Sequence, residues 1–353
     1  MSADRPPVPG GGGPTLMIRE AAEAPDIVAR QIIENEAAMR ALGARLRAKP
    51  PRFAVTCARG SSDSAATYAK YLLEIRLGLV VASVGPSVSS IYGAKPRMNE
   101  ALFLAISQSG KSPDLVDLAE TARADGALTV ALVNDTASPL AERCEIVLPL
   151  HAGPEKSVAA TKSYIASLAA ILQLLAQWSG DPMLDRAVRR LPDDLGDALA
   201  RDWRGAVPPL KETRSLYVIG RGAGYAAAQE AALKFKETCG LHAEALSAAE
   251  LMHGPLALTG ADFPVILFSQ QDEALASLGE LAGWLVARGV TVIAAGPAAR
   301  AGMLTLPTLA GLHPLAQPIA LIQSFYPLAE ALALARGRDP DRPPHLQKIT
   351  ETR

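Results

Sequence analysis

The chain has 353 residues, of which 49% are hydrophobic and 20% are charged, and its formal net charge at pH 7 is −1. This length is enough for one large core or for two cores of ordinary domain size. The balanced charge argues against a nucleic-acid partner, and the lack of any block of Lys and Arg argues against an anionic membrane surface.

Three cysteines, Cys57, Cys144 and Cys239, lie far apart in the sequence and form no CxxC pair. This pattern fits the reducing cytoplasm, where we expect the protein, and gives no indication of a metal site. Residues 1–15, MSADRPPVPGGGGPT, lack the apolar segment of a secretory signal and are rich in Pro and Gly, so we expect a disordered tail. The apolar run LAAILQLLAQW at 168–178 is too short to span a membrane and predicts a buried helix.

Short apolar strands alternate with helices along both halves of the chain. Each half starts with a strand, a glycine turn and an Ala-rich helix, and continues with a second strand, a helix and a third strand. The predicted strands are Phe53–Thr56, Ala101–Ile106 and Leu128–Val133 in the first half, and Leu216–Ile219, Val265–Phe268 and Val290–Ala294 in the second. Wholly apolar strands between helices indicate a parallel sheet covered on both faces, in which ligands bind beyond the carboxyl ends of the strands.

The remaining segments connect or follow these units. A long helix over about Val158–Gln177 is expected to close the first half, and residues 181–209 are expected to hold a helix and a linker. After Gly337 the sequence becomes polar and rich in Pro, so residues 337–353 are expected to form an extended C-terminal tail.

The two halves are related by an offset of 162 residues. This single offset carries Arg59–Gly60 onto Arg221–Gly222, Ser107–Gln108 onto Ser269–Gln270, and Thr129–Val130 onto Thr291–Val292. One register kept over three separate pairs indicates two copies of one unit. We therefore predict an α/β fold of two tandem subdomains, residues 16–200 and 201–336, each a flavodoxin-like parallel sheet flanked by helices.

The loop SQSGKS, residues 107–112, stands between a predicted strand and a predicted helix. Backbone N–H groups at a helix start have no intrahelical partner and carry partial positive charge, serine hydroxyls add donors, and Gly110 allows close approach. This combination predicts an anion site, most naturally for phosphate. The alternative is a turn that is merely capped by serine and started by Pro113.

Two observations favour the anion site over the capped turn. The second copy reads SQQDEA at the same place, so the hydroxyls are not needed to build the fold. The first copy has another hydroxyl loop, GSSDS at 60–64, after its first strand, and two such loops can hold one phosphate from two sides. A dinucleotide site at GRGAGY, residues 220–225, is disfavoured because the third glycine and the acidic residue of that motif are missing.

Four segments in one order resemble the sugar-isomerase (SIS) family, and more narrowly the isomerase half of the glutamine–fructose-6-phosphate aminotransferases, or glucosamine-6-phosphate synthases. They are SQSGKSPD, GPEKSVAATKS, ALKFKETCGLHAEALSAAELMHGPLAL and DPDRPPHLQKIT, and the likeness runs from about Ile18 to the C-terminus. The resemblance implies two tandem SIS subdomains. The family's glutaminase domain starts with a cysteine after Met1, where this chain has Ser2, so we expect no use of glutamine as ammonia donor, as in the SIS-type glucosamine-6-phosphate deaminases.

The resemblance implies a set of ligand-binding residues that includes the two hydroxyl loops. The phosphate is expected at Gly60, Ser61, Ser62, Ser107, Gln108, Ser109 and Ser112. Glu155 and Val158, in GPEKSV, stand where the family contacts the sugar.

The resemblance also assigns a base. Glu237 matches the carboxylate that moves a proton between C1 and C2, a task that one carboxylate above that bond can perform. Lys234, three residues earlier on the same helix face, can assist proton transfer and hold Glu237 ionised. Without the family, a solvated helical ion pair would explain these two residues as well.

Two further residues have roles in the family. His253 matches the histidine that opens the pyranose ring and reaches into the neighbouring subunit's site, which implies a homodimer. Lys348 matches the tail lysine that forms a Schiff base with the open-chain ketose. The alternatives are a histidine that caps the turn before Gly254–Pro255 and a solvated terminal lysine.

Three departures from the synthase pattern bear on the identity of the substrate and on the direction of the reaction. Ala160 replaces a serine near the sugar, Arg59 replaces a small thiol residue, and His345 replaces an asparagine in the tail.

We expect an amino-sugar-phosphate deaminase/isomerase that converts glucosamine 6-phosphate and water to fructose 6-phosphate and ammonia, with no metal or redox cofactor. Close alternatives are an ammonia-dependent aminotransferase/isomerase, a galactosamine-6-phosphate deaminase and a fructosamine-phosphate deglycase. A different class is a non-catalytic sugar-phosphate sensor, since SIS domains also serve in regulators. Against the sensor stand Glu237, His253 and Lys348 together, and the lack of a DNA-binding segment.

Overall fold

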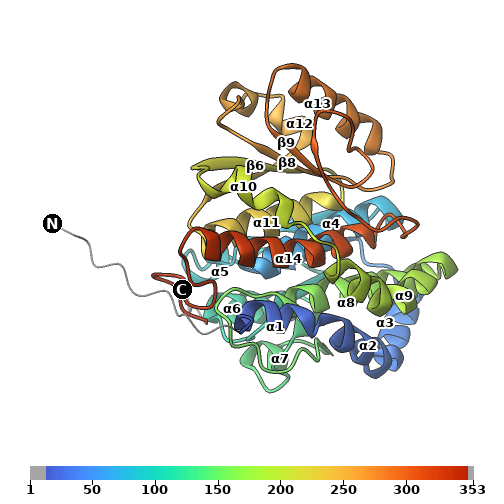
Figure 1. Ribbon diagram of the computed structural model, residues 1–353. Coiled ribbons are helices and arrows are strands. Elements are labelled where there is room, and N and C mark those ends of the chain that lie inside the picture. Colours follow the sequence, from blue (N-terminus) through green and yellow to red (C-terminus); the bar gives the residue numbers. More distant parts are fainter. Residues whose placement is uncertain (1–12, 349–353) are drawn as a thin grey trace.

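The computed structural model describes residues 13–348, which form two parallel sheets with helices between and around them (Figure 1). Residues 1–12 of the predicted N-terminal tail and residues 349–353 of the predicted C-terminal tail lie outside the described residues.

The two sheets have the same topology. The first contains β1 (Phe53–Cys57), β2 (Val81–Ser83), β3 (Ala101–Ser107), β4 (Leu128–Val133) and β5 (Ile146–Pro149) in the order β2-β1-β3-β4-β5. The second contains β6 (Ser215–Gly220), β7 (His242–Ser247), β8 (Val265–Phe268), β9 (Val292–Ala295) and β10 (Leu304–Leu306) in the order β7-β6-β8-β9-β10. Numbered within its own half, each sheet reads 2-1-3-4-5, the flavodoxin-like order. The predicted α/β class and the duplication are therefore confirmed.

The helices lie in layers around these sheets. The first half has α1 (Leu16–Ala22), α2 (Ala24–Glu34), α3 (Glu36–Ala48), α4 (Ser61–Leu77), α5 (Ser87–Ser90), α6 (Pro113–Ala124), α7 (Pro139–Arg143), α8 (Lys162–Ser179) and α9 (Pro182–Leu199). The second half has α10 (Val207–Lys211), α11 (Gly224–Cys239), α12 (Ala248–Leu251), α13 (Leu275–Ala287) and α14 (Gln317–Ala335). Two short 3₁₀ turns cover Arg204–Ala206 and Pro255–Leu258.

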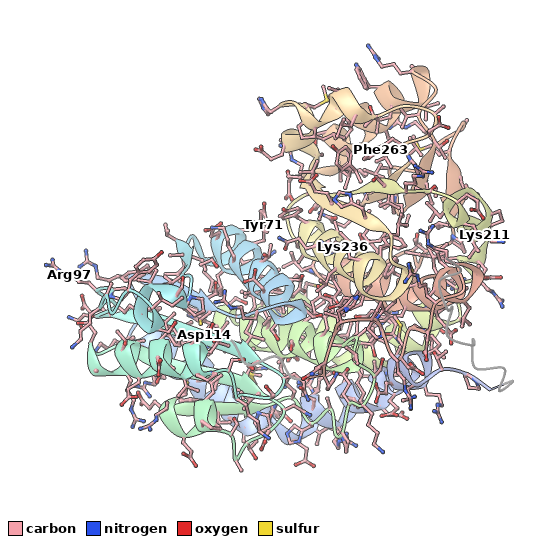
Figure 2. All side chains as sticks on the ribbon, turned by 90° about the vertical axis from the view of Figure 1, so that its left-hand side faces the viewer. Tyr71, Arg97, Asp114, Lys211, Lys236 and Phe263 are labelled. Atoms are coloured by element: carbon pink, nitrogen blue, oxygen red, sulfur yellow. The ribbon has the colours of Figure 1, made fainter. Side chains whose placement is uncertain are left out.

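One hydrophobic core joins the two halves. Helices α4 and α8 of the first half and α11 and α14 of the second contribute to the same buried cluster, and Figure 1 shows α11 and α14 between the upper sheet and the lower helices. In Figure 2, Tyr71 of α4 and Lys236 of α11 lie where the halves meet, while Asp114 and Phe263 lie one in each half. A smaller core on the outer face of each sheet packs α6 and α7 in the first half and α12 and α13 in the second.

Three details differ from the sequence prediction or refine it. The helix expected from Val158 begins at Lys162, because residues 158–161 form a loop. The short strands β2, β5, β7 and β10 were not predicted. Helix α14 is long and apolar enough to cross a membrane by length and composition, but 72% of it is buried in the protein, as in the core helix of a globular fold.

Two helical glycines test how closely the core is packed. A Cβ on Gly43 of α3 would lie 2.7 Å from the backbone carbonyl carbon of Gln177, whereas a Cβ on Gly196 of α9 would meet nothing within 4 Å. We expect Gly43→Ala to lower the free energy of unfolding by about 1–3 kcal/mol. Gly196→Ala, the matched control, should raise it by up to about 1 kcal/mol because alanine favours the helix. Urea denaturation followed by circular dichroism measures both, and equal effects of the two changes would contradict this packing.

Candidate functional site

A cavity of about 370 Å³ lies at the carboxyl ends of β1 and β3. This is the topological switch point of the first sheet, where ligands bind in open α/β folds. Most of the predicted site residues line it: Gly60, Ser61, Ser62, Ser107, Gln108, Ser109, Ser112, Val158, Glu237 and Lys348. Side chains that the sequence analysis did not select also line it, among them Ser163, Tyr164, Ser167 and Gln347. The predicted residues Glu155, Lys234 and His253 are not part of this lining.

The two hydroxyl loops lie at the starts of two helices that face this cavity. Helix α4 begins after Gly60, whose φ of +58° lies in the left-handed region that glycine tolerates. Helix α6 begins after Ser112, whose side chain makes no capping hydrogen bond. The alternative of a serine used only as a cap therefore does not describe Ser112. Backbone N–H groups and hydroxyls gathered at two helix starts have the features of an anion site.

Gly110 fixes the shape of the second loop. Its φ is +63°, and a Cβ there would lie 2.1 Å from Oγ of Ser138. Its backbone N–H donates to Oγ of Ser107 at 3.0 Å, which closes the loop on itself. No larger residue fits this position without moving the loop.

Arg59 joins the two loops. Its Nη2 lies 2.8 Å from Oδ2 of Asp114, which is fully buried in the first turn of α6. The Arg59 side chain is 49% exposed and lines the cavity. The departure at Arg59 thus places a guanidinium, with further N–H donors, beside the hydroxyl loops.

The corresponding place in the second half is filled by a side chain. Nε2 of Gln270 donates to the backbone oxygen of Arg221 and to Oδ2 of Asp272, both at 2.7 Å. A Cβ on Gly224 would lie 2.3 Å from Oε1 of Gln270, so the turn accepts this side chain only because it has glycine there. The second copy therefore keeps the fold of the site but not its open space.

Helix α11 carries a row of charges toward the cavity. Lys234 is fully buried, and its Nζ lies 2.5 Å from Oε2 of Glu237 and 3.3 Å from Oε1 of Glu230. It also donates to Oγ of Ser61 at 3.1 Å, which links α11 to the first hydroxyl loop. Glu237 is 22% exposed and lines the cavity, whereas Glu230 is fully buried. The predicted Lys234–Glu237 pair is therefore present, but it is not the solvated surface pair that was the alternative.

The buried charges shift one another's protonation. Burial raises the pKa of Glu230 to about 7, although the charge of Lys234 opposes this rise. Burial alone would lower the pKa of Lys234, but the charges of Glu230 and Glu237 outweigh it and raise that pKa. Sequence reasoning missed Glu230, although its position four residues before Lys234 on a predicted helix was a usable signal.

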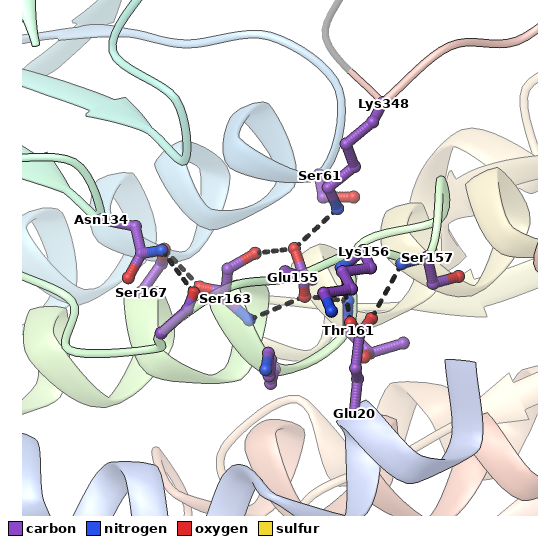
Figure 3. A network of polar contacts seen from close by, with 12 residues as sticks. Glu20, Ser61, Asn134, Glu155, Lys156, Ser157, Thr161, Ser163, Ser167 and Lys348 are labelled. Atoms are coloured by element: carbon purple, nitrogen blue, oxygen red, sulfur yellow. Dashed lines mark hydrogen bonds and ion pairs between the residues drawn. The ribbon is translucent and has the colours of Figure 1, made fainter. Parts of the chain in front are cut away.

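The C-terminal tail reaches the cavity through Lys348. Its Nζ lies 2.9 Å from Oε2 of Glu155, as Figure 3 shows. Glu155, which the sequence analysis expected to contact the sugar, is fully buried, does not line the cavity and pairs with the tail lysine. Lys348 is thus not the solvated terminal lysine that was the alternative.

His253 lies away from the cavity of its own chain. It follows α12, is exposed and has exposed apolar neighbours, Met252 at 49% and Leu258 at 63%.

The part of the chain from 13 to 348 contains no group of three or more His, Cys, Asp or Glu placed to hold a metal ion. Burial raises the pKa of the thiols of Cys57 and Cys144 to about 12 and of Cys239 to about 11, so none of them is activated as a nucleophile.

Comparisons with known proteins match both halves of the chain. The SIS domain model matches residues 51–177 and 210–311, one match in each half. A glutamine–fructose-6-phosphate aminotransferase of Thermus thermophilus is 33% identical over 368 residues, covering 96% of this chain and 59% of that protein. The chain therefore spans about three fifths of the length of this curated relative.

Solved structures share the whole fold. A provisionally assigned phosphosugar isomerase of Silicibacter pomeroyi DSS-3 is 46% identical with a TM-score of 0.88, covering 93% of this chain and 100% of that chain. A glucosamine-6-phosphate deaminase of Thermotoga maritima has a TM-score of 0.76 at 18% identity, covering 96% of this chain and 100% of that chain, and shows likeness of fold.

The raised pKa of Glu230 predicts an unusual dependence of stability on pH. Between its ordinary pKa of 4.5 and the folded value of about 7, the folded chain keeps a proton that the unfolded chain has lost, so this residue's contribution to stability falls as pH rises through that range. Glu230→Gln should remove this contribution to the pH dependence of stability. As the pH rises from 5 to 8, the free energy of unfolding of the variant should therefore rise by roughly 1–3 kcal/mol relative to that of wild type.

Urea denaturation at several pH values measures this difference. Glu280→Gln, a change at an exposed carboxylate on α13, is the matched control and should follow the wild-type curve at every pH. Parallel curves for wild type and Glu230→Gln would contradict the assigned protonation.

Proposed function

The chain belongs to the SIS domain family, and we propose that it is an amino-sugar-phosphate deaminase/isomerase that converts glucosamine 6-phosphate and water to fructose 6-phosphate and ammonia. The family relationship supports a sugar-phosphate isomerase role. The observation that carries the finer proposal is one cavity that combines two hydroxyl loops with the carboxylate of Glu237 and the amine of Lys348. The first two provide an anion site and a base, and the third provides a nucleophile for carbon.

The phosphate would be held by the loops at the starts of α4 and α6. Their hydroxyls and backbone N–H groups are neutral donors at the positive ends of two helix dipoles. Arg59, fixed by Asp114, would add a charged donor from the side. The sugar then extends from the phosphate toward Glu237 and Lys348, which line the same cavity.

Glu237 would act as the base of the isomerisation. In the open-chain amino aldehyde it removes the proton from C2 and returns it to C1, while a second proton passes from the amine nitrogen to O1. The aldehyde thereby becomes a primary alcohol and the amine at C2 becomes an imine. Nζ of Lys234, 2.5 Å from Oε2 of Glu237, holds this carboxyl group in place at the cavity.

Lys348 would then release ammonia. The ammonium of Lys348, paired with Glu155, gives a proton to the imine nitrogen at C2, and the neutral amine that results attacks C2. A new C–N bond forms, and the original nitrogen leaves as ammonia. Water adds to the lysine imine and returns the free amine and the ketone of fructose 6-phosphate. Nitrogen, oxygen and hydrogen balance over the two steps, and no redox change occurs.

Ring opening would come from the histidine of a second copy. His253 does not line the cavity of its own chain, and it is exposed together with Met252 and Leu258. An exposed histidine among exposed apolar side chains fits a subunit interface better than a free surface. We therefore propose a homodimer in which each chain gives His253 to the other's cavity.

The deaminase proposal predicts ammonia and fructose 6-phosphate release from glucosamine 6-phosphate by the wild type. Glu237→Gln should lower kcat by about 10²–10⁴-fold, because the base is lost while the phosphate loops remain. Coupled assays for ammonia and fructose 6-phosphate measure release, and calorimetry measures fructose 6-phosphate binding. Glu280→Gln serves as control. Tight binding without release by the wild type would instead favour another amino-sugar phosphate or the sensor.

The dimer proposal predicts complementation between inactive variants. Glu237→Gln and His253→Ala each damage every site of their own homodimers. In a mixed dimer, one of the two sites has both Glu237 and His253, so co-folding equal amounts should restore about a quarter of wild-type activity. Light scattering gives the oligomeric state. A dimer whose mixed form stays inactive would contradict the exchange of His253.

A further inference from the structure

One polar network connects the C-terminal tail, the loop before α8 and helix α1 (Figure 3). We propose that Glu155 is a positioning residue that docks Lys348 in the cavity, and that α1 supports this dock by binding both the loop that carries Glu155 and the tail that carries Lys348. The docking itself does not depend on the substrate, whereas its consequence for imine formation rests on the proposed function.

Glu155 is held by three hydrogen bonds that do not involve the tail. Its Oε1 accepts the backbone N–H groups of Thr161 at 2.9 Å and Ser163 at 3.2 Å, and its Oε2 accepts the Ser163 hydroxyl at 2.7 Å. Burial alone would raise the pKa of Glu155, but the charge of Lys348 and these donors outweigh it and lower that pKa. The group is therefore a buried carboxylate of fixed orientation, with Oε2 directed to Lys348.

A buried carboxylate at this place needs a cation. Its side chain has no exposed surface, whereas Lys348 keeps 23% of its side chain exposed and lines the cavity. The three other donors to Glu155 are neutral, so the ion pair with Lys348 balances its charge. This geometry holds the amine at the cavity wall.

Helix α1 holds both partners of this ion pair. Glu20, on α1 and 4% exposed, accepts the backbone N–H groups of Lys156 at 2.5 Å and Ser157 at 3.1 Å, next to Glu155 in the chain. At the other end of the same helix, the carboxylate of Asp341 accepts the N–H groups of Leu16 and Met17, both at 2.7 Å.

Residues 344–347 of the tail are exposed to solvent. Residues 343–348 form neither helix nor strand, so ordering them costs conformational entropy that side-chain contacts must offset. Asp341 fixes the beginning of this segment and Lys348 fixes its end. Loss of the bond to Glu155 should therefore free the lysine while the phosphate loops stay intact.

Trypsin provides a direct test in the ligand-free chain, because it cuts after Lys348 only when this side chain leaves Glu155. Cleavage releases residues 349–353 and is followed by mass spectrometry. Glu155→Gln should speed this cut roughly 10-fold or more, the factor expected for loss of a charge-assisted hydrogen bond. Asp341→Asn, which leaves the cavity lining unchanged, should also speed it. Cleavage after Arg338 in the same digest reports general opening, and Glu280→Gln is the matched control.

A second measurement separates positioning from general damage. Reductive trapping with cyanoborohydride in the presence of fructose 6-phosphate marks the imine as a mass gain on Lys348. Glu155→Gln should reduce trapping at least about 10-fold while inorganic phosphate binds as in wild type, because the hydroxyl loops are untouched. A merely structural role would weaken both.

The outcomes are distinct. Wild-type rates of cleavage after Lys348 in Glu155→Gln would overturn the dock, and wild-type rates in Asp341→Asn alone would overturn the role of α1. Faster cleavage in both variants, combined with no trapping in the wild type, would support the dock and overturn the proposed imine chemistry.

Discussion

A lysine with no exposed surface lies where the two halves of the chain meet, and the site is built around its charge. The ammonium of Lys234 lies 2.5 Å from Glu237 and 3.3 Å from Glu230 on its own helix and donates to Ser61 at the start of α4. Removing one partner of a buried pair typically costs about 3–5 kcal/mol, so these groups constrain one another strongly. Because Ser61 belongs to the first half and the carboxylates to the second, this arrangement exists only when α11 packs against α4. The common core of the two halves is therefore a condition for the site as well as for the fold.

The two copies of the duplicated fold differ at the equivalent place in each sheet. In each sheet, a turn follows the first strand and a loop follows the third, and both lie at the switch point between these two neighbouring strands. The first copy leaves this place open and lines it with hydroxyls, while the second fills it with the side chain of Gln270. The helix after the second copy's turn, α11, instead directs Glu237 into the first copy's cavity. Under the proposed function, one copy offers the anion site and the other offers the base, and this division would explain why two units of one topology differ so much in their loops.

The central strands and the hydroxyl loops could be predicted from sequence because their signals are local. Strands such as β4 and β8 are buried on both faces and read as short apolar runs, and their predicted bounds agree with the structure. The edge strands could not be predicted in this way: β2 and β10 have three residues each, and β7 is half exposed and reads HAEALS. At the site, the loops followed from residue types at helix starts. The partner of Lys348 did not, because Glu155 and Lys348 are 193 residues apart and meet only through tertiary packing.

The charges around the cavity come in pairs, and this bears on how a phosphate would be recognised. Arg59 is paired with Asp114, Lys234 with Glu237, and Lys348 with Glu155. A phosphate held by hydroxyls, backbone N–H groups and two helix starts leaves these pairs in place, since neutral donors and helix dipoles supply the attraction. The carboxylate of Glu237 then remains available for proton transfer, and Lys348 remains available for attack on carbon once it has given up a proton. Glu230, whose pKa burial raises to about 7, adds a negative charge to this balance only as the pH rises past neutrality. The protonation of one fully buried carboxylate therefore sets the net charge next to Glu237, although Glu230 does not line the cavity.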